Sequence, residues 1–112
     1  MFKLELTEAQ FQGQIEELAR RYGWHYLHIE RAMNDRGYWR TPIRGDLGKG
    51  WPDLVLLKGS RVLFVELKAN GKPLTAEQRG ILELLSHIPG AECYVWRPAQ
   101  FEEILGRLID EH

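Results

Sequence analysis

Two apolar segments joined by a three-residue turn constrain the fold of this chain more than any other feature. Residues 53–57 and 61–68 are rich in Val, Leu and Phe, and Lys58-Gly59-Ser60 lies between them. This spacing is typical of a β-hairpin, and the glycine can adopt the positive φ that such turns use. The two segments are therefore predicted to pair as antiparallel strands.

Periodicity on either side of the hairpin predicts the remaining elements. Apolar side chains recur with helical spacing in 7–22, in 75–88 and after Pro98, whereas 24–29 and 91–96 are typical of strands. The expected order is αβββαβα. Because a strand, a helix and a strand in succession need a crossover, 91–96 is expected to lie parallel to 61–68. The predicted class is α/β or, alternatively, α+β, with a small mixed sheet flanked by helices.

Length and composition exclude several classes of protein. A chain of 112 residues, 44% hydrophobic and 28% charged, is expected to form one globular domain over 1–112. Cys93 is the only cysteine, which excludes an intrachain disulfide and a thiolate zinc site. No apolar run approaches the ~18 residues that span a bilayer, and the first ten residues are unlike a signal peptide. We expect an intracellular, cytoplasmic protein that has no membrane contact.

The apolar face of the second predicted hairpin strand, residues 61–68, has charged residues at its end. Glu66 and Lys68 share a face with Phe64 and are about 6.6 Å apart along an ideal strand. The turn length places Asp53 near the same end of the hairpin. Such charges are ordinarily solvated or form structural ion pairs. Converging carboxylates repel one another unless a cation neutralises them, however, and their oxygens are ligands that Mg²⁺ prefers.

Two side chains on the predicted helices extend this cluster. Glu8 falls within the apolar stripe of the first helix, so it is expected to face the sheet, although a first-turn carboxylate also suits the helix dipole. Gln78 completes a capping box with Thr75 and also continues its helix's stripe toward the end of the Glu66 strand. Both side chains are candidate site residues with an alternative structural explanation.

The order of motifs resembles a nuclease family. Pro52-Asp53, twelve intervening residues and Glu66-Leu67-Lys68 are similar to the PD-(D/E)XK signature. The surrounding sequences GWPDLV at 50–55, VELK at 65–68, LTAEQR at 74–79 and VWRP at 95–98 resemble the VRR-NUC family, in its stand-alone phage and bacterial type. The resemblance implies a restriction-endonuclease-like core, αβββαβ plus a C-terminal helix. It also implies a metal-dependent endonuclease that acts in DNA repair or recombination, as a homodimer on Holliday junctions.

The resemblance assigns roles to individual residues. Asp53, Glu66 and the Leu67 carbonyl would bind Mg²⁺, for which Mn²⁺ would substitute, and Lys68 would position the attacking water. Glu8 would be the acid carried by the first helix and a candidate ligand at a second metal position. Gln78 would support the site or the phosphate. Either one or two metal ions could bind at this site. No small-molecule cofactor is expected.

A basic stretch before the hairpin is the predicted nucleic-acid contact. Residues 31–51 hold five basic side chains against two acidic ones, on a chain whose net charge is −1. The predicted contacts are Arg31, Arg36, Arg40, Arg44, Lys49 and, after the second hairpin strand, Lys72. Tyr38 and Trp39 could stack on unpaired bases. A solvated loop is the alternative interpretation.

Other functions stay open at this point. A nuclease of this kind could prefer flaps or other branched DNA over four-way junctions. The same fold could also bind DNA without cutting it, although costly charges beside an apolar face argue against that. A protein-interaction domain with structural salt bridges is a third possibility, and it predicts no stabilisation by metal ions.

Overall fold

The computed structural model describes residues 6–29 and 44–109. The α-helices and strands are α1 (Glu8–Arg21), β1 (His25–His28), β2 (Leu54–Lys58), β3 (Arg61–Leu67), α2 (Ala76–Ser86), β4 (Ala91–Trp96) and α3 (Phe101–Ile109). Short 3₁₀ turns precede β2 (η1, Gly48–Gly50) and α3 (η2, Pro98–Gln100). The predicted order αβββαβα is confirmed.

The four strands form one mixed sheet in the order β1-β2-β3-β4. β1 and β3 each pair antiparallel with β2, and β4 pairs parallel with β3. The turn between β2 and β3 has two residues, Gly59-Ser60, and not the expected three, because Lys58 belongs to β2 and pairs with Arg61. Gly59 has a φ of 59° in this turn, which explains the need for glycine there. The helix α2 makes the crossover from β3 to β4, as the strand–helix–strand order predicts.

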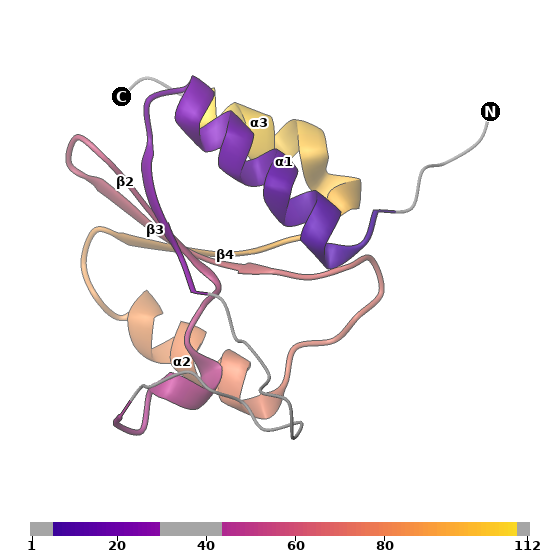
Figure 1. Ribbon diagram of the computed structural model, residues 1–112. Helices are drawn as coiled ribbons and strands as arrows, with labels where there is room; N and C mark the ends of the chain where they lie inside the picture. The colour runs from indigo at the N-terminus through magenta and orange to yellow at the C-terminus, as the bar shows by residue number, and fades with distance from the viewer. Residues whose placement is uncertain (1–5, 30–43, 110–112) are drawn as a thin grey trace.

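The two faces of the sheet are covered unequally (Figure 1). The layer of α1 and α3 covers one face, where Leu54, Leu56, Leu63 and Val65 are fully buried. From α1, the helical stripe of Phe11, Ile15 and Ala19 is also fully buried. On the opposite face, α2 and η1 lie toward one end of the sheet only.

Helix ends account for small differences from the predicted bounds. Thr7 caps α1 in a capping box with Gln10. Trp24 was expected in the first strand, but its backbone N donates to Ala19 O at 2.8 Å, so it belongs to the end of α1. Its Nε1 donates to Leu108 O at 2.9 Å, which connects the ends of α1 and α3. The last helix begins at Phe101 because Pro98 opens a 3₁₀ turn first.

Residues 6–29 and 44–109 include the helices α1, α2 and α3. No helix in these ranges combines the length and the apolar character that spanning a bilayer requires.

Candidate active site at the end of the β2–β3 hairpin

The carboxylates predicted to converge do meet at one end of the hairpin. Leu54 pairs with Val65, so the next positions in this antiparallel register are Asp53 and Glu66. Asp53 directly precedes β2, and its Oδ2 accepts a hydrogen bond from Leu67 N at 3.0 Å. The Asp53 carboxylate is therefore held against the end of β3, at the end of the hairpin where it was predicted to lie.

Glu66 is the one buried charged side chain in the described part of the chain, with 2% of its surface exposed. Its Oε1 accepts a hydrogen bond from Gln78 Nε2 at 2.9 Å. Burying a carboxylate is costly unless polar groups or a cation compensate the charge. The burial of this charge in so small a protein supports a role beyond packing.

Gln78 connects that carboxylate to the start of α2. Its Oε1 accepts from Thr75 N at 2.9 Å, and Thr75 Oγ1 accepts from Gln78 N at 3.1 Å, which completes the predicted capping box. An amide side chain has both an acceptor and donors, so Gln78 caps the helix and contacts Glu66 at the same time. Its predicted location near the strand end is confirmed.

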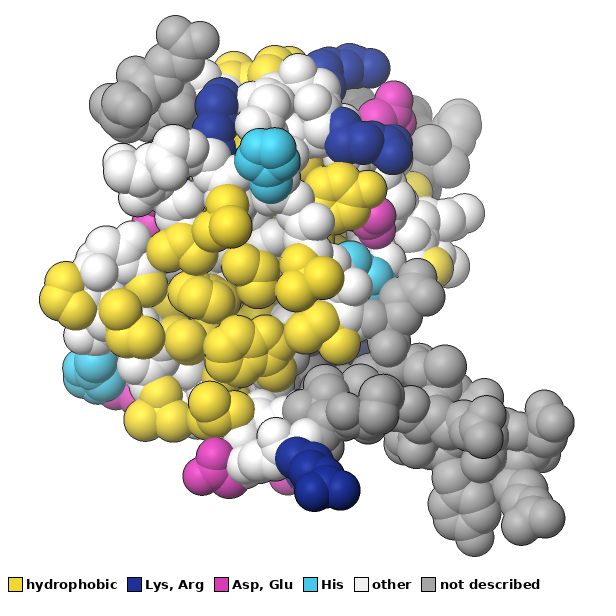
Figure 2. All heavy atoms as spheres, turned by 60° about the vertical axis from the view of Figure 1, so that its left-hand side comes forward, with side chains coloured by type: hydrophobic (Ala, Val, Ile, Leu, Met, Phe, Trp, Pro, Cys, Tyr) yellow, Lys and Arg dark blue, Asp and Glu magenta, His cyan; other side chains and the backbone are white. Residues whose placement is uncertain are grey.

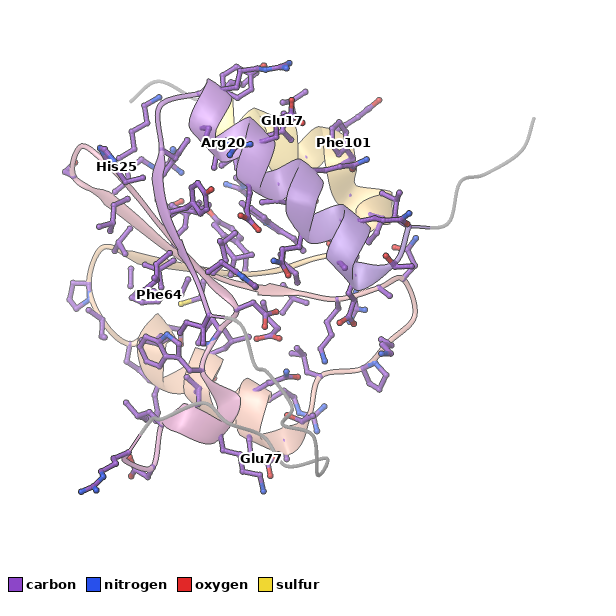
Figure 3. The ribbon with its side chains drawn as sticks, viewed as in Figure 1. Glu17, Arg20, His25, Phe64, Glu77 and Phe101 are labelled. Atoms are coloured by element: carbon purple, nitrogen blue, oxygen red, sulfur yellow. The ribbon has the colours of Figure 1, made fainter. Side chains whose placement is uncertain are left out.

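Lys68 follows β3 and continues its pairing with β4, because Lys68 N donates to Trp96 O at 3.0 Å. Alternation along the strand places the half-buried Lys68 side chain on the same face as Phe64 and Glu66. Figure 3 shows Phe64 on the α2 side of the sheet, while Glu17, Arg20 and Phe101 lie with the opposite helices. Lys68 thus follows Glu66 by two residues at the end of β3, and the convergence of the two side chains on one site stays a prediction.

Glu8 reaches the same end of the sheet from the layer of α1. Its Oε1 accepts a hydrogen bond from Ala69 N at 3.3 Å and lies 3.7 Å from Lys72 Nζ. The expectation that Glu8 faces the sheet is therefore confirmed. In this position it contacts the loop that follows β3 and carries one of the predicted DNA contacts, Lys72.

Arg97 ties that loop to the end of β4. Its Nη1 donates to the carbonyl oxygen of Ala69 at 2.9 Å and to that of Lys72. Asn70 Oδ1 accepts from Ala99 N at 3.0 Å and adds a second connection. Because the partners of Arg97 are backbone carbonyls, which every residue has, no motif could have indicated this role.

Gly50 allows the segment before Asp53 to approach α2 closely. A Cβ at Gly50 would lie 2.5 Å from the backbone C and O of Glu77 and 3.0 Å from Gln78 N. Only glycine fits at this distance. The contact fixes the chain leading into Asp53 against the helical turn that carries Gln78, so both site residues depend on it.

The predicted nucleic-acid contacts are only partly within the described residues. Arg31, Arg36 and Arg40 lie outside them, as do Tyr38 and Trp39. Arg44 and Lys49 are exposed on the stretch that enters η1 and β2.

Lys49 also helps to hold this stretch against α2. Its Nζ lies 3.4 Å from Glu77 Oε1. The pKa of Glu77 is lowered, first by a backbone hydrogen bond at the helix start and then by Lys49. Lys49 therefore has a structural role through this ion pair, in addition to any contact with DNA.

The oxygen donors at the hairpin end are suited to Mg²⁺. Within 6–29 and 44–109, no group of three or more His, Cys, Asp or Glu side chains could hold a metal ion. Mg²⁺ commonly binds through one or two carboxylates and keeps its remaining positions for water and substrate phosphate. That Asp53 and Glu66, with the Leu67 carbonyl, form such a set stays a prediction. A contribution of Glu8 to a metal position stays a prediction.

Comparisons of the chain with known protein families, characterised proteins and solved structures found no match. The interpretation of the site therefore depends on its own residues and geometry.

Proposed function

We propose that this protein is a metal-dependent, structure-selective DNA endonuclease of the VRR-NUC type, with a PD-(D/E)XK core. One observation carries the proposal. Asp53, the buried Glu66 and Lys68 lie together at the end of the β2–β3 hairpin, with Gln78 donating to Glu66 at 2.9 Å. Two oxygen ligands beside an ammonium group are what metal-assisted hydrolysis of a phosphodiester requires.

Each residue of the proposed site has its own role in the reaction. Asp53 and Glu66, with the Leu67 carbonyl, would hold Mg²⁺ or Mn²⁺, and the ion would supply an activated water and compensation of the phosphate charge. Lys68 orients the attacking water. The water gives up a proton as its oxygen bonds to phosphorus, one ester P–O bond breaks, and the departing oxygen takes up a proton. Gln78 keeps the Glu66 carboxylate in place through the hydrogen bond that it donates.

Branched DNA is the proposed substrate and a homodimer the proposed active form. Basic residues at Arg44, Lys49 and Lys72 lie on the segments before β2 and after β3, the two segments that flank the carboxylates. Phosphate contacts from such residues position a nuclease on DNA without reading its sequence. One chain supplies one site, so paired cuts across a four-way junction need two chains.

A denaturing-gel cleavage assay tests the proposal. A four-way junction, a 5′ flap, a linear duplex and a single strand are each incubated with Mg²⁺, Mn²⁺ or EDTA. Paired nicks in the junction that require the metal support a dimeric resolvase, whereas cutting of flaps alone keeps the chemistry and changes the substrate. If the folded protein binds these DNAs but cuts none of them with either metal, the non-cleaving DNA-binding module takes its place.

A further inference from the structure

The strand β4 forms one edge of the sheet. Among the described residues it has a neighbouring strand on one side only, which is β3. An exposed edge presents N–H and C=O groups that can pair with another chain, and proteins usually shield it with charged residues, proline or a very short strand. β4 has six residues and no proline or lysine. Its one charged side chain, Glu92, is bound to Arg61 through two hydrogen bonds of 2.8 Å. This edge is therefore open to pairing.

The pairing of β4 with β3 shows which of its main-chain groups point outward. Trp96 O accepts a hydrogen bond from Lys68 N at 3.0 Å, so the main-chain groups of Trp96 point toward β3. Because this direction alternates along a strand, the N–H and C=O groups of Cys93 and Val95 point away from β3. Within 6–29 and 44–109, no hydrogen bond joins these outward groups to another segment. Two donors and two acceptors are thus available at the edge.

A groove of about 340 Å³ runs between this edge and α2. Cys93 pairs with Phe64, whose side chain lies on the α2 side of the sheet, so the side chains of Cys93 and Val95 point to that side as well. A strand added beside β4 would place every second side chain in the groove. The apolar residues that line the groove are Leu74, Leu82, Cys93 and Val95.

Two charged residues of α2, Arg79 and Glu83, also line the groove and are one helical turn apart. Arg79 is exposed and forms no ion pair within the described part of the chain. Glu83 Oε1 lies 3.3 Å from His87 Nε2. A strand of nucleic acid would meet the Glu83 carboxylate and apolar walls here. A peptide with a single acidic side chain can instead pair with Arg79 and leave Glu83 beside His87.

We infer that the edge of β4 and the adjacent groove bind an extended peptide segment of a different protein, which adds a strand to the sheet. Its main chain pairs with Cys93 and Val95, alternate apolar side chains fill the groove, and an acidic side chain pairs with Arg79. In this mode of recognition the main-chain hydrogen bonds provide affinity, and the pockets for alternate side chains provide specificity.

A second copy of this chain lacks the acidic group that Arg79 requires. The two edge strands of the sheet are β1 and β4. β1 has the sequence His-Tyr-Leu-His and contains no acid. In β4, Glu92 pairs with the buried Leu63, so it lies on the face of the sheet that α1 and α3 cover. Neither strand of a second copy could bring a carboxylate to Arg79, which favours a different protein as the partner.

Apolar surface alone does not select this site. Figure 2 shows hydrophobic side chains gathered into one broad area on one side of the molecule. Leu27 and Leu57, on β1 and β2, are 59% and 49% exposed. A peptide attracted only by apolar surface could bind to such side chains without a fixed register. The outward main-chain groups of β4 impose a register, and an experiment can detect it.

Peptide selection followed by N-methylation tests the inference without any DNA. Random octapeptides displayed on phage are selected on immobilised wild-type protein. The selected sequences should have apolar residues at every second position and an aspartate or glutamate near one end. N-methylation of the peptide nitrogens that pair with β4 should weaken binding of the synthetic consensus peptide at least about tenfold, whereas methylation of the intervening nitrogens should change it less than about twofold.

Two variants and hydrogen exchange locate the binding site. Arg79→Glu is expected to weaken binding of the consensus peptide at least about tenfold and to prefer a peptide whose acidic residue is replaced by lysine. Arg20→Glu is the matched control, because Arg20 is exposed on α1, on the other side of the sheet, and it should bind as the wild type does. The amides of Cys93 and Val95 should become protected when the peptide binds. Circular dichroism should show the same fold for all three proteins.

Several results would overturn the inference, and none of them depends on whether the protein cuts DNA. These are a selection that enriches no peptide, equal effects of N-methylation at every position, and an Arg79→Glu variant that binds the consensus peptide as tightly as the wild type. Protection of Leu27 and Leu57 in place of Cys93 and Val95 would assign the peptide to the open sheet face. Protection of Cys93 and Val95 by DNA, or by raising the concentration of the protein alone, would assign the edge to nucleic acid or to a second copy.

Discussion

Gln78 donates a hydrogen bond of 2.9 Å to the carboxylate of Glu66, the one charged side chain that is buried among the described residues. The same amide caps α2 through its oxygen. One side chain thus links the stability of a helix to the position of a proposed metal ligand, and each link can be tested separately.

Gln78→Glu is expected to destabilise the protein by about 1–3 kcal/mol at pH 7, because the donor to Glu66 is lost and a second carboxylate takes its place. A glutamate at this position can still accept the capping hydrogen bond. Protonation of one of the two carboxylates should relieve their repulsion, so the loss of stability should be smaller near pH 5 than at pH 7. Chemical denaturation at both pH values measures it.

Gln10→Glu is the control for this prediction. Gln10 occupies the same position in the capping box of α1, where its Oε1 accepts from Thr7 N at 3.0 Å. It is exposed, and α1 lies on the opposite side of the sheet from α2. An equal loss of stability in Gln10→Glu would mean that the effect at Gln78 comes from the cap alone.

Gly50→Ala should destabilise the protein by about 1–3 kcal/mol, because the new Cβ would overlap the backbone of Glu77. Gly13→Ala should instead stabilise the protein. A Cβ at Gly13 meets nothing within 4 Å, and alanine in a helix interior is favoured over glycine by roughly 0.5–1 kcal/mol. Thermal melts of the two variants compare them directly, and equal effects would contradict the close approach of η1 to α2.

Arg97→Gln is expected to loosen the loop after β3, because its two contacts with the carbonyls of Ala69 and Lys72 are lost. Hydrogen exchange should report this locally. Lys72 N, which donates to Ala69 O at 3.2 Å, should exchange at least about tenfold faster, while the β2–β3 pairing stays protected. Arg20→Gln, on the exposed side of α1, should leave both regions unchanged.

The ion pair of Glu92 and Arg61 predicts a pH dependence of stability. The Arg61 hydrogen bonds lower the pKa of Glu92 in the folded state. A lowered folded-state pKa stabilises the protein above the unfolded-state pKa, and this contribution is lost as the pH falls through the folded-state value. Glu92→Gln should therefore cost about 1 kcal/mol at pH 7 and little below pH 3.

Glu17→Gln is the comparison for Glu92→Gln. Its carboxylate lies 3.5 Å from Arg21, but both side chains are mostly exposed, and surface pairs of this kind contribute little. Denaturant unfolding at a series of pH values should show a pH-dependent deficit for Glu92→Gln only. A deficit of constant size from pH 7 to pH 3 would show that packing, and not charge, explains the effect.

Much of the fold could be predicted because local patterns dictate it. The hairpin and its antiparallel pairing followed from two apolar segments around a glycine turn, and the strand–helix–strand order required β4 to be parallel to β3. The expected three-residue turn is one residue too long, and the two-residue turn Gly59-Ser60 is what places Asp53 opposite Glu66. The helical stripe of α1 correctly oriented Glu8 toward the sheet. These features depend on periodicity and chain connectivity, which a single sequence contains.

Other features depend on tertiary contacts that carry no local pattern. The pairing of Gln78 with Glu66 needed the position of α2 against β3. The role of Arg97 lies in contacts with backbone carbonyls, and the fit at Gly50 depends on how closely two segments approach. The exposed Leu27 and Leu57 lie on one face of the sheet, and this placement follows from the sheet register.

The most direct test of the central claim is the Mg²⁺-dependent cleavage rate of Lys68→Ala against wild type and Arg20→Ala, on whichever DNA substrate the wild type cuts fastest. All three proteins should give the same circular dichroism spectrum. The proposed site predicts that Arg20→Ala cuts at the wild-type rate and that Lys68→Ala is slower by a factor of about 10²–10⁴. Cleavage by folded Lys68→Ala at the wild-type rate would contradict the assignment of the site to the end of the β2–β3 hairpin.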